Sequence, residues 1–268
     1  VHKTGTTAIQ TFIFQNMIEL RAQGYYLPQF LFDVENKPAE IRYAIINGEE
    51  SKTRAYLKKI VSKAQKLSCD TVIISDEDYS KTTECDLKDT AIFAEFFEQI
   101  DVLMYCRRQD RQSESGFAFC VMWEGTKYSN SAKQWYRENP GKKYFELAKY
   151  YEQTIPGCKI KAVSYDFNAK NLIGSFIKTC AIMQAEFVMP DRESSNISAN
   201  KFVVEVMNAV NRYDLSNKLF LEIRNFCLKH KKLQNGPSPI FFSNEDRELN
   251  QEMIGDDTEK FIEEYNGG

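Results

Sequence analysis

The sequence is poor in the residues that build metal sites and disulfide frameworks. Only two histidines occur, His2 and His230, and the seven cysteines are scattered without a single C-x-x-C pair. An odd number of thiols, several of them inside apolar runs, is typical of free cysteines in a reducing compartment. A zinc site is not expected, because such sites need closely spaced Cys and His ligands.

Long hydrophobic runs and an excess of charge are also missing. No stretch of 18 apolar residues occurs and no signal peptide is recognisable, so we expect no transmembrane segment and predict a cytoplasmic location. The formal net charge of −3 gives no reason to expect nucleic acid as a partner, although it is compatible with a local basic patch. With 43% hydrophobic residues, the 268-residue chain can bury a sizeable core.

Short apolar, β-branched runs alternate with helical periodicity along the chain. Strands are predicted over residues 25–27, 71–74, 102–106 and 159–165, and helices over 6–22, 52–67, 87–100, 110–123, 144–154 and 172–182. The part from 191 to 268 is predicted to be mainly helical. This alternation predicts an α/β fold in which helices cover both faces of a parallel sheet, built as a single domain over 1–268. Ligands of such sheets bind at the carboxyl ends of the strands.

A candidate phosphate loop stands at the beginning of the chain. It reads Lys3-Thr4-Gly5-Thr6-Thr7 and leads directly into a predicted helix. A glycine among small hydroxyl residues at a helix N-terminus forms an anion site from backbone N–H groups and the helix dipole. A plain helix N-cap is the alternative interpretation. An ATPase loop carries its Lys after the second Gly, whereas Lys3 precedes Gly5, which argues against an NTPase.

A second candidate anion site follows the strand predicted over 102–106. Arg107 stands at the carboxyl end of that strand, and Ser115 lies eight residues on, in the next predicted helix. An Arg fork and a hydroxyl in this placement can bind one phosphate. Arg108 and Arg111 are weaker candidates, and a charged loop that only contacts solvent is the alternative interpretation.

These two segments resemble the sulfotransferase family, and in particular its bacterial, carbohydrate-type branch with a P-loop-like three-layer α/β/α fold. The resemblance rests on the run from His2 to Gln10, with Phe12 and Asn16, and on the Arg107–Ser115 spacing. It implies binding of 3′-phosphoadenosine-5′-phosphosulfate (PAPS), with Lys3 at the phosphosulfate bridge. Gln10 and Asn16 are interpreted as structural. In this family a strand precedes the loop, so we expect one ahead of Val1.

The resemblance also assigns the remaining cofactor contacts. The 5′-phosphate would be held by Gly5, Thr6 and Thr7, and Thr4 is counted with them as a cofactor-binding residue. The 3′-phosphate would be held by Arg107 and Ser115. Arg192, Asn196 and Ser198 resemble an Arg/Asn/Ser pattern of the related enzymes. One interpretation is that this segment closes over the nucleotide, and helix capping by Ser198 is the alternative.

Sulfuryl transfer to a hydroxyl needs a base that takes the acceptor proton. His2 lies within the phosphate loop and His230 in a Lys-rich stretch, so neither is well placed. The acidic run Asp76-Glu77-Asp78 follows a predicted buried strand, and related bacterial enzymes carry Ser-x-Glu there. The resemblance therefore implies Glu77 as the catalytic base, with Asp76 and Asp78 as alternatives. Acids after an apolar strand also resemble the magnesium-binding carboxylate of a kinase or NTPase.

We therefore predict a PAPS-dependent sulfotransferase that transfers a sulfuryl group to a hydroxyl of a glycan or glycolipid by in-line displacement, without a metal. A P-loop kinase or NTPase using Mg-ATP, and a non-catalytic nucleotide-binding module, are the alternatives. Acceptor loops are expected at 29–50 and 124–141. Their aromatic residues and the neighbouring tryptophan either stack on sugar rings or pack in a lid: Trp123, Tyr128, Trp135 and Tyr136.

Overall fold

The computed structural model describes residues 3–31, 39–80, 87–190, 199–230, 233, 237 and 240–265. The chain forms two compact units. Unit 1 consists of Val1–Cys106, Tyr144–Ser195 and Lys260–Gly268, and unit 2 consists of Arg107–Lys143 and Asn196–Glu259. Such a division does not decide which parts fold on their own, so the single domain stays a prediction.

Unit 1 contains all four strands of the described residues. Its elements, in chain order, are α1 (Thr6–Gln15), α2 (Met17–Ala22), β1 (Tyr25–Tyr26), η1 (Gln29–Leu31), α3 (Ala39–Ile46), α4 (Glu50–Lys66), β2 (Thr71–Val72), η2 (Glu77–Ser80), η3 (Leu87–Glu95), β3 (Asp101–Cys106), α7 (Tyr144–Thr154), β4 (Lys159–Ser164), α8 (Tyr165–Asn168), η4 (Ala169–Asn171) and α9 (Leu172–Thr179). Unit 2 contains α5 (Gln109–Met122), α6 (Ala132–Glu138), α10 (Lys201–Val210) and α11 (Asn217–Lys229). The last helix, α13 (Asn244–Tyr265), begins in unit 2 and ends in unit 1.

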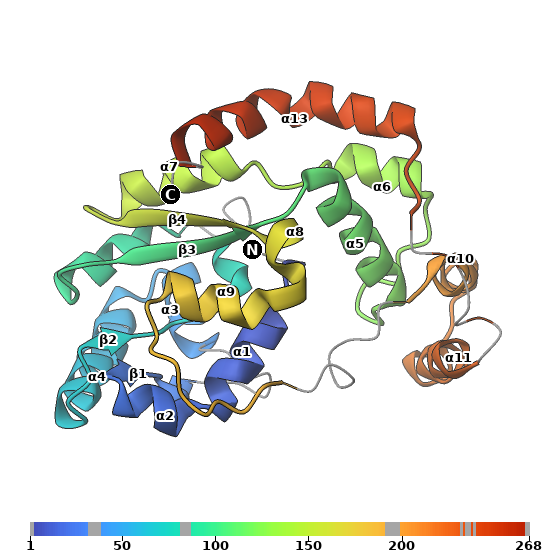
Figure 1. Cartoon of the computed structure of the whole chain (residues 1–268). Coiled ribbons are helices and arrows are strands. Elements are labelled where there is room, and N and C mark those ends of the chain that lie inside the picture. The colour runs from blue at the N-terminus through green and yellow to red at the C-terminus, as the bar shows by residue number, and fades with distance from the viewer. Residues whose placement is uncertain are drawn as a thin grey trace. The chain divides into compact units, whose positions relative to one another are not determined.

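The strands form two parallel pairs, β1 with β2 and β3 with β4. In the longer pair the register runs from Asp101 opposite Lys159 to Cys106 opposite Ser164, and the two strands lie side by side in Figure 1. Parallel strands joined through helices are compatible with the predicted α/β class. The three-layer P-loop form of that class stays a prediction.

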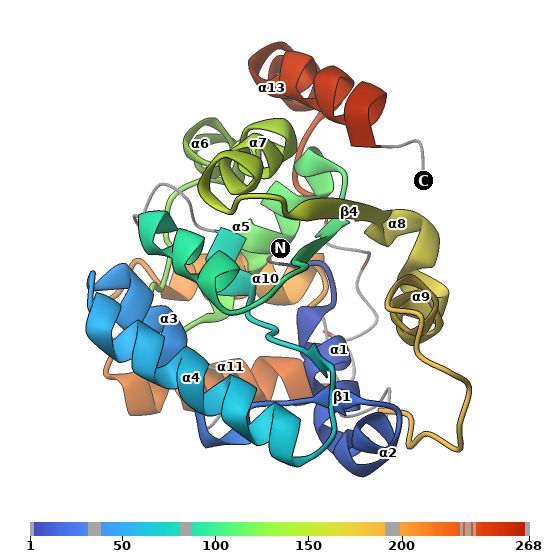
Figure 2. The same ribbon diagram turned by 90° about the vertical axis from the view of Figure 1, so that its left-hand side faces the viewer.

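Side chains on the two faces of the β3–β4 pair enter different cores. Leu103 and Tyr105 pack with residues of α1 and α9, whereas Met104 packs with residues of α7. This is the alternation expected of a strand that is covered on both faces. Figures 1 and 2 both show α9 beside α1. The helix that follows the candidate phosphate loop is therefore anchored in the core of unit 1, with Phe12 fully buried.

Three helical segments differ from the expectation. The helix predicted over 6–22 is interrupted at Asn16, whose side chain amide donates to the carbonyl of Phe12 at 2.8 Å. The segment 87–100 forms a 3₁₀ helix, Leu87–Glu95, in place of an α-helix. The polar excursion at 124–141 contains a short helix, α6, which Ser131 caps by accepting a hydrogen bond from the Gln134 backbone N–H at 3.1 Å.

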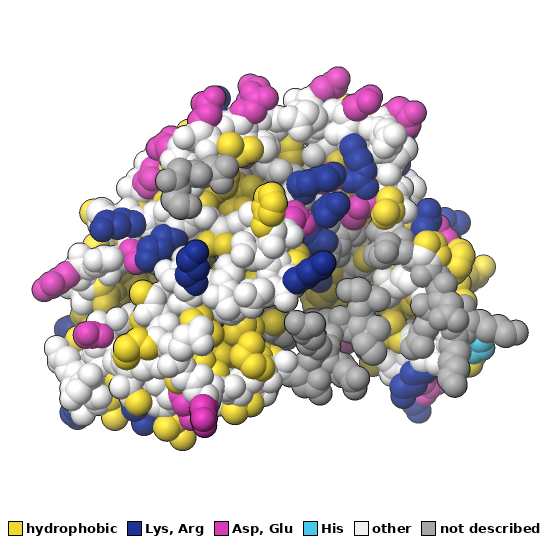
Figure 3. All heavy atoms as spheres, viewed as in Figure 1, with side chains coloured by type: hydrophobic (Ala, Val, Ile, Leu, Met, Phe, Trp, Pro, Cys, Tyr) yellow, Lys and Arg dark blue, Asp and Glu magenta, His cyan; other side chains and the backbone are white. Residues whose placement is uncertain are grey.

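Unit 2 has a core of its own between α5, α10 and α11. Phe117 and Val121 of α5 meet Val204 and Met207 of α10 and Phe220 of α11 there. Acidic side chains gather along the exposed side of α13, at the top of Figure 3. Within the described ranges, no helix combines the length and the apolar character needed to cross a membrane.

Candidate functional site

The candidate phosphate loop makes a left-handed turn into α1. Lys3 and Gly5 both have positive φ, 62° and 75°, and the carbonyl of Gly5 accepts the backbone N–H of Ala8 at 3.0 Å. A Cβ atom on Gly5 would lie only 2.4 Å from Leu172 Cδ2 and 3.1 Å from the ring of Tyr165. Position 5 therefore needs glycine both for its backbone conformation and for the close approach of α8 and α9.

The first turn of α1 presents the groups that bind anions. The first N–H groups of any helix have no partner within the helix, and they carry the positive end of its dipole. Thr6 is half-buried and Thr7 is exposed, while Thr4 is fully buried. The structure thus places Thr6 and Thr7 at the helix N-terminus, and it makes Thr4 a packed residue of the loop.

Glu77 lies against the same helix. It begins η2, and its Oε2 accepts a hydrogen bond of 2.9 Å from Nε2 of Gln10, a residue that is 5% exposed. Gln10 follows Thr6 by four residues, or about 6 Å along the helix axis. Side chains on a helix tilt toward its N-terminus, so the Glu77 carboxylate lies alongside the first turns of α1.

The two acids flanking Glu77 are directed elsewhere. Arg42 of α3 donates from Nε to Asp76 Oδ2 at 2.7 Å and lies 3.3 Å from Asp78 Oδ2. The Asp76 side chain is fully buried, and this burial raises the pKa of Asp76 although Arg42 opposes the shift. Burial lowers the pKa of Arg42, but the Asp76 carboxylate outweighs it and the net pKa is raised. Asp76 and Asp78 thus tie η2 to α3, and Glu77 contacts α1.

The second anchor predicted from the sequence belongs to unit 2. Arg107 is half-buried two residues before the start of α5, and Ser115 is half-buried within that helix. Arg108 is exposed and donates from Nε to Asp110 Oδ1 at 3.1 Å. Lys3–Thr7 and Glu77 share unit 1, whereas the pair of Arg107 and Ser115 belongs to unit 2, and its role at the 3′-phosphate stays a prediction.

The buried face of α5 carries an ion-pair network that sequence reasoning missed. Arg247 of α13 pairs with Asp110 through Nη1, and its Nη2 lies 2.9 Å from Glu114 Oε1. The same Glu114 oxygen accepts the backbone N–H of Phe241 at 2.9 Å. Two acids four residues apart on a helix face are a signal for such a partner, but the partner lies more than 130 residues away.

Three of the four aromatic residues considered for sugar stacking are engaged in packing. Tyr136 is 2% exposed and lies 4.0 Å from the ring of Phe242, measured between centroids. Trp135 donates its indole N–H to the carbonyl of Ser113 at 3.0 Å, and Tyr128 packs edge-on against Trp135. Trp123 is the most exposed of the four, at 44%, and it is stacked on the exposed ring of Phe119.

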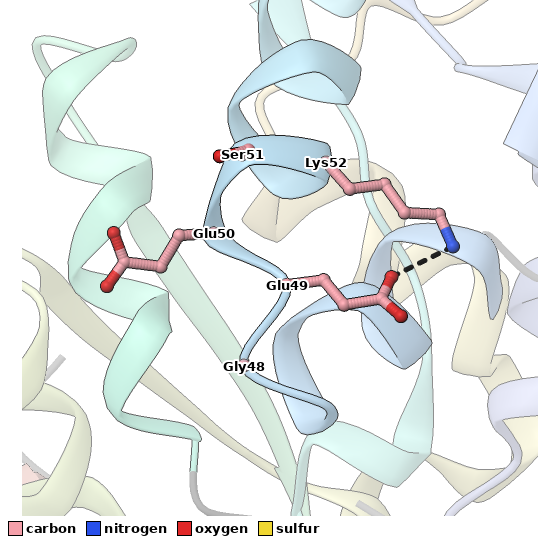
Figure 4. A pocket seen from close by; sticks show the side chains of 5 residues that line it. All are labelled: Gly48, Glu49, Glu50, Ser51 and Lys52. Atoms are coloured by element: carbon pink, nitrogen blue, oxygen red, sulfur yellow. Dashed lines mark ion pairs between the residues drawn. The ribbon is translucent and has the colours of Figure 1, made fainter.

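Figure 4 shows a shallow hollow at the start of α4. Gly48, Glu49, Glu50, Ser51 and Lys52 line it, and Lys52 pairs with Glu49 at 2.9 Å. Glu50 points away from this pair. None of the predicted catalytic or cofactor-binding residues lines the hollow, whereas Gly48, Glu49 and Glu50 belong to the predicted acceptor loop 29–50.

Some residues named in the sequence analysis cannot be placed. His2, Arg192, Asn196 and Ser198 lie outside the described residues. The six cysteines that the structure describes are free, with Cys69 and Cys227 buried and the others half-buried. Among the described side chains, no group of three or more His, Cys, Asp or Glu is arranged to hold a metal ion.

Comparison with known proteins gives no match of any kind. No family model, no curated protein and no solved structure is significantly similar to the chain. A functional assignment therefore depends on the loop, the carboxylate and the sequence resemblance alone.

Proposed function

We propose that the protein is a PAPS-dependent sulfotransferase of P-loop-like three-layer fold, acting on a hydroxyl of a glycan or glycolipid. One observation carries the proposal: the Glu77 carboxylate is held beside the first turns of the helix whose N-terminus bears Lys3–Thr7. The candidate anion-binding loop leads into α1, and the candidate base contacts the same helix through Gln10. The family and the cytoplasmic location come from the sequence resemblance and composition described above.

The residues of the loop suit the phosphosulfate group chemically. The helix N-terminus, the Thr6 and Thr7 hydroxyls and the Lys3 ammonium are all donors or positive charges, as a bound anion requires. Gly5 lets the backbone come close to such a group, and Leu172 and Tyr165 support the loop from behind. The 3′-phosphate would be bound by Arg107 and Ser115, as the resemblance implies.

The proposed reaction assigns a proton transfer to Glu77. Glu77 takes the proton of the acceptor hydroxyl while the hydroxyl oxygen attacks sulfur, and the bond between sulfur and the 5′-phosphate oxygen breaks. Lys3 stabilises the charge that develops on this leaving oxygen, which departs with adenosine 3′,5′-bisphosphate. The products are a sulfate ester of the acceptor and the bisphosphate.

The ion pairs of Asp76 bear on the kinase alternative. A magnesium-binding carboxylate after β2 would have to be Asp76 or a neighbour, and Asp76 is fully buried against Arg42 at 2.7 Å. A carboxylate with its charge matched by Arg42 is a poor metal ligand, which argues against a kinase that would bind magnesium through Asp76 or Asp78. A non-catalytic module is the remaining alternative, and it would bind nucleotide without needing Glu77.

PAPS turnover by single variants tests the proposal. Release of adenosine 3′,5′-bisphosphate is measured with EDTA present, using neutral oligosaccharides, acidic oligosaccharides and a glycolipid as acceptors. Glu77→Gln is expected to lower kcat by about 10²–10⁴-fold because the base is lost. Lys3→Ala is expected to lower kcat by about 10²–10³-fold because the leaving oxygen loses its stabilising charge.

Asp78→Asn serves as the comparison, since Asp78 adjoins Glu77 but faces Arg42. This variant is expected to keep a kcat close to that of the unmodified protein, because Asp78 faces Arg42, and Arg42 keeps its closer partner Asp76 at 2.7 Å. Loss of turnover in Asp78→Asn but not in Glu77→Gln would show that the base is wrongly assigned. Turnover of ATP that requires magnesium, with none of PAPS, would reject the proposed function.

A further inference from the structure

Helix α1 carries two buried side-chain amides, and they make different kinds of contact. Asn16, at the far end of the helix, bonds only to backbone groups. Its Nδ2 donates to the carbonyls of Phe12 and Val188, both at 2.8 Å, and its Oδ1 accepts the backbone N–H of Val188 at 2.6 Å. These bonds satisfy the helix end and fix the segment around Val188, which is a structural role.

Gln10 bonds instead to an acidic side chain of the candidate site. Its Nε2 donates to Glu77 Oε2 at 2.9 Å and to the Ser75 carbonyl at 3.4 Å. A carboxylate and a carbonyl can only accept hydrogen bonds, so the amide must turn its nitrogen toward both of them. The orientation of the Gln10 amide is thereby determined by chemistry, and its one well-formed bond is to a charged group.

We propose that Gln10 is a positioning residue, which fixes the position of the Glu77 carboxylate along the N-terminal turns of α1. This inference rests on the proposed function. It explains why a buried glutamine occupies the face of α1 that contacts Ser75 and Glu77, where an apolar residue would fill the core at lower cost. The loop that would bind the phosphosulfate and the base that would act on the acceptor are then fixed by one rigid helix.

The contact also determines how the base responds to pH. A donor that bonds to the ionised carboxylate stabilises this form, so losing the donor moves proton uptake to higher pH. Other charges near Glu77 act on it as well. Asp76 and Asp78 flank it, Arg42 approaches from α3 and Lys3 precedes α1. These charged groups are the same in every variant of Gln10, so a difference in the pH response between the variants is due to the side chain at position 10.

Three substitutions separate a positioning role from a structural one. Gln10→Met keeps the shape of the side chain but removes the donor, and Gln10→Glu places a second carboxylate against Glu77. Asn16→Leu is the matched control, because it removes the other buried amide of the same helix. For each variant, the pH dependence of kcat, the KM for PAPS and the Tm are measured.

Gln10→Met is expected to lower kcat by about 10- to 100-fold with the KM for PAPS nearly unchanged, because the base loses its alignment. The acid limb of its pH profile moves to higher pH, and that of Gln10→Glu moves further because the two carboxylates repel. Asn16→Leu lowers the Tm and leaves the profile in place. If Gln10→Met lowers the Tm but leaves kcat and the profile unchanged, as expected for Asn16→Leu, the inference is overturned.

A measurement without turnover keeps this inference separate from the proposed function. In protein labelled with ¹³C at the glutamate carboxyl carbons, the Glu77 signal is identified from Glu77→Gln and titrated by NMR. The titration midpoint is expected to be higher in Gln10→Met than in the unmodified protein. Equal midpoints would reject the role of Gln10, whereas absence of any PAPS turnover in the unmodified protein would reject the function.

Discussion

At the scale of single residues, the site depends on a few positions where no other side chain fits equally well. Gly5 combines a left-handed backbone with a close approach to Leu172. Gln10 has two acceptors and no alternative orientation. Each of these constraints can be separated from general stability by comparison with a second glycine or a second buried amide elsewhere in unit 1.

Gly5→Ala is predicted to lower the free energy of unfolding by more than the backbone strain alone would. A left-handed alanine costs about 1 kcal/mol, and the added methyl group must displace the buried Leu172 side chain, which brings the loss of stability to about 3 kcal/mol. Gly157→Ala is the control, because Gly157 has nearly the same φ, 73°, with no atom within 4 Å of the added methyl group. It should cost about 1 kcal/mol, the strain alone.

Urea denaturation measures the two free energies of unfolding, and calorimetry measures binding of adenosine 3′,5′-bisphosphate. Binding should be lost in Gly5→Ala and retained in Gly157→Ala. Equal losses of stability in the two variants would mean that Leu172 moves aside freely, and that the loop is not close-packed as described.

At the scale of elements, ion pairs connect α5 to α13, and their side chains differ in solvent exposure. The side chains of Asp110 and Glu114 are 10% and 8% exposed, and that of Arg247 is 23% exposed. Burial alone would raise the pKa of Asp110. Hydrogen bonds from Arg108 and from the backbone of Arg111, together with the charges of Arg108 and Arg247, outweigh burial and hold that pKa below its usual value.

This lowered pKa predicts a loss of stability in acid. Because Asp110 binds its proton less readily when folded, its contribution is complete above the pKa of an unfolded aspartate, about 3.9. The contribution is lost as the pH falls through the folded pKa. Asp110→Asn should therefore cost about 2 kcal/mol at pH 7 and show a smaller further loss between pH 5 and pH 2 than the unmodified protein.

Urea denaturation at several pH values measures this difference. Glu205→Gln is the control within unit 2, because Glu205 is 53% exposed and 3.9 Å from Lys201. That change should cost at most about 0.5 kcal/mol. If Asp110→Asn and the unmodified protein lose the same free energy of unfolding between pH 5 and pH 2, Asp110 does not supply the pH dependence.

The elements that the sequence predicts well are those with local causes. Helix α7 begins and ends where the apolar periodicity does, at Tyr144 and Thr154, and β3 differs from the prediction by one residue. At the interruption, Asn16 bonds both to the nearby carbonyl of Phe12 and to Val188, which is 172 residues away, so a local pattern contains only part of its contacts. No local pattern contains the contacts of Gln10 with Glu77 and of Arg247 with Asp110, which the fold alone brings together.

At the scale of the whole molecule, the predicted ligand contacts are divided between the two units. Lys3–Thr7 and Glu77 belong to unit 1, and Arg107 and Ser115 belong to unit 2. The loop could be predicted from the glycine and hydroxyl residues that precede a helix. The acid could be predicted from its place after a strand, because the carboxyl ends of parallel strands bind ligands. The acceptor could not be predicted from the aromatic residues. Their exposure depends on the fold, and three of the four candidates are packed.

Calorimetric titration with adenosine 3′,5′-bisphosphate in EDTA, beside ATP with magnesium, tests the central claim most directly. The account predicts that the bisphosphate binds without metal and that Arg107→Ala weakens it by about 10- to 100-fold, as expected for loss of a charged hydrogen bond. Arg108→Ala, whose side chain is exposed and paired with Asp110, should weaken binding far less. Binding of ATP with magnesium, without binding of the bisphosphate, would contradict the account and favour a kinase or NTPase.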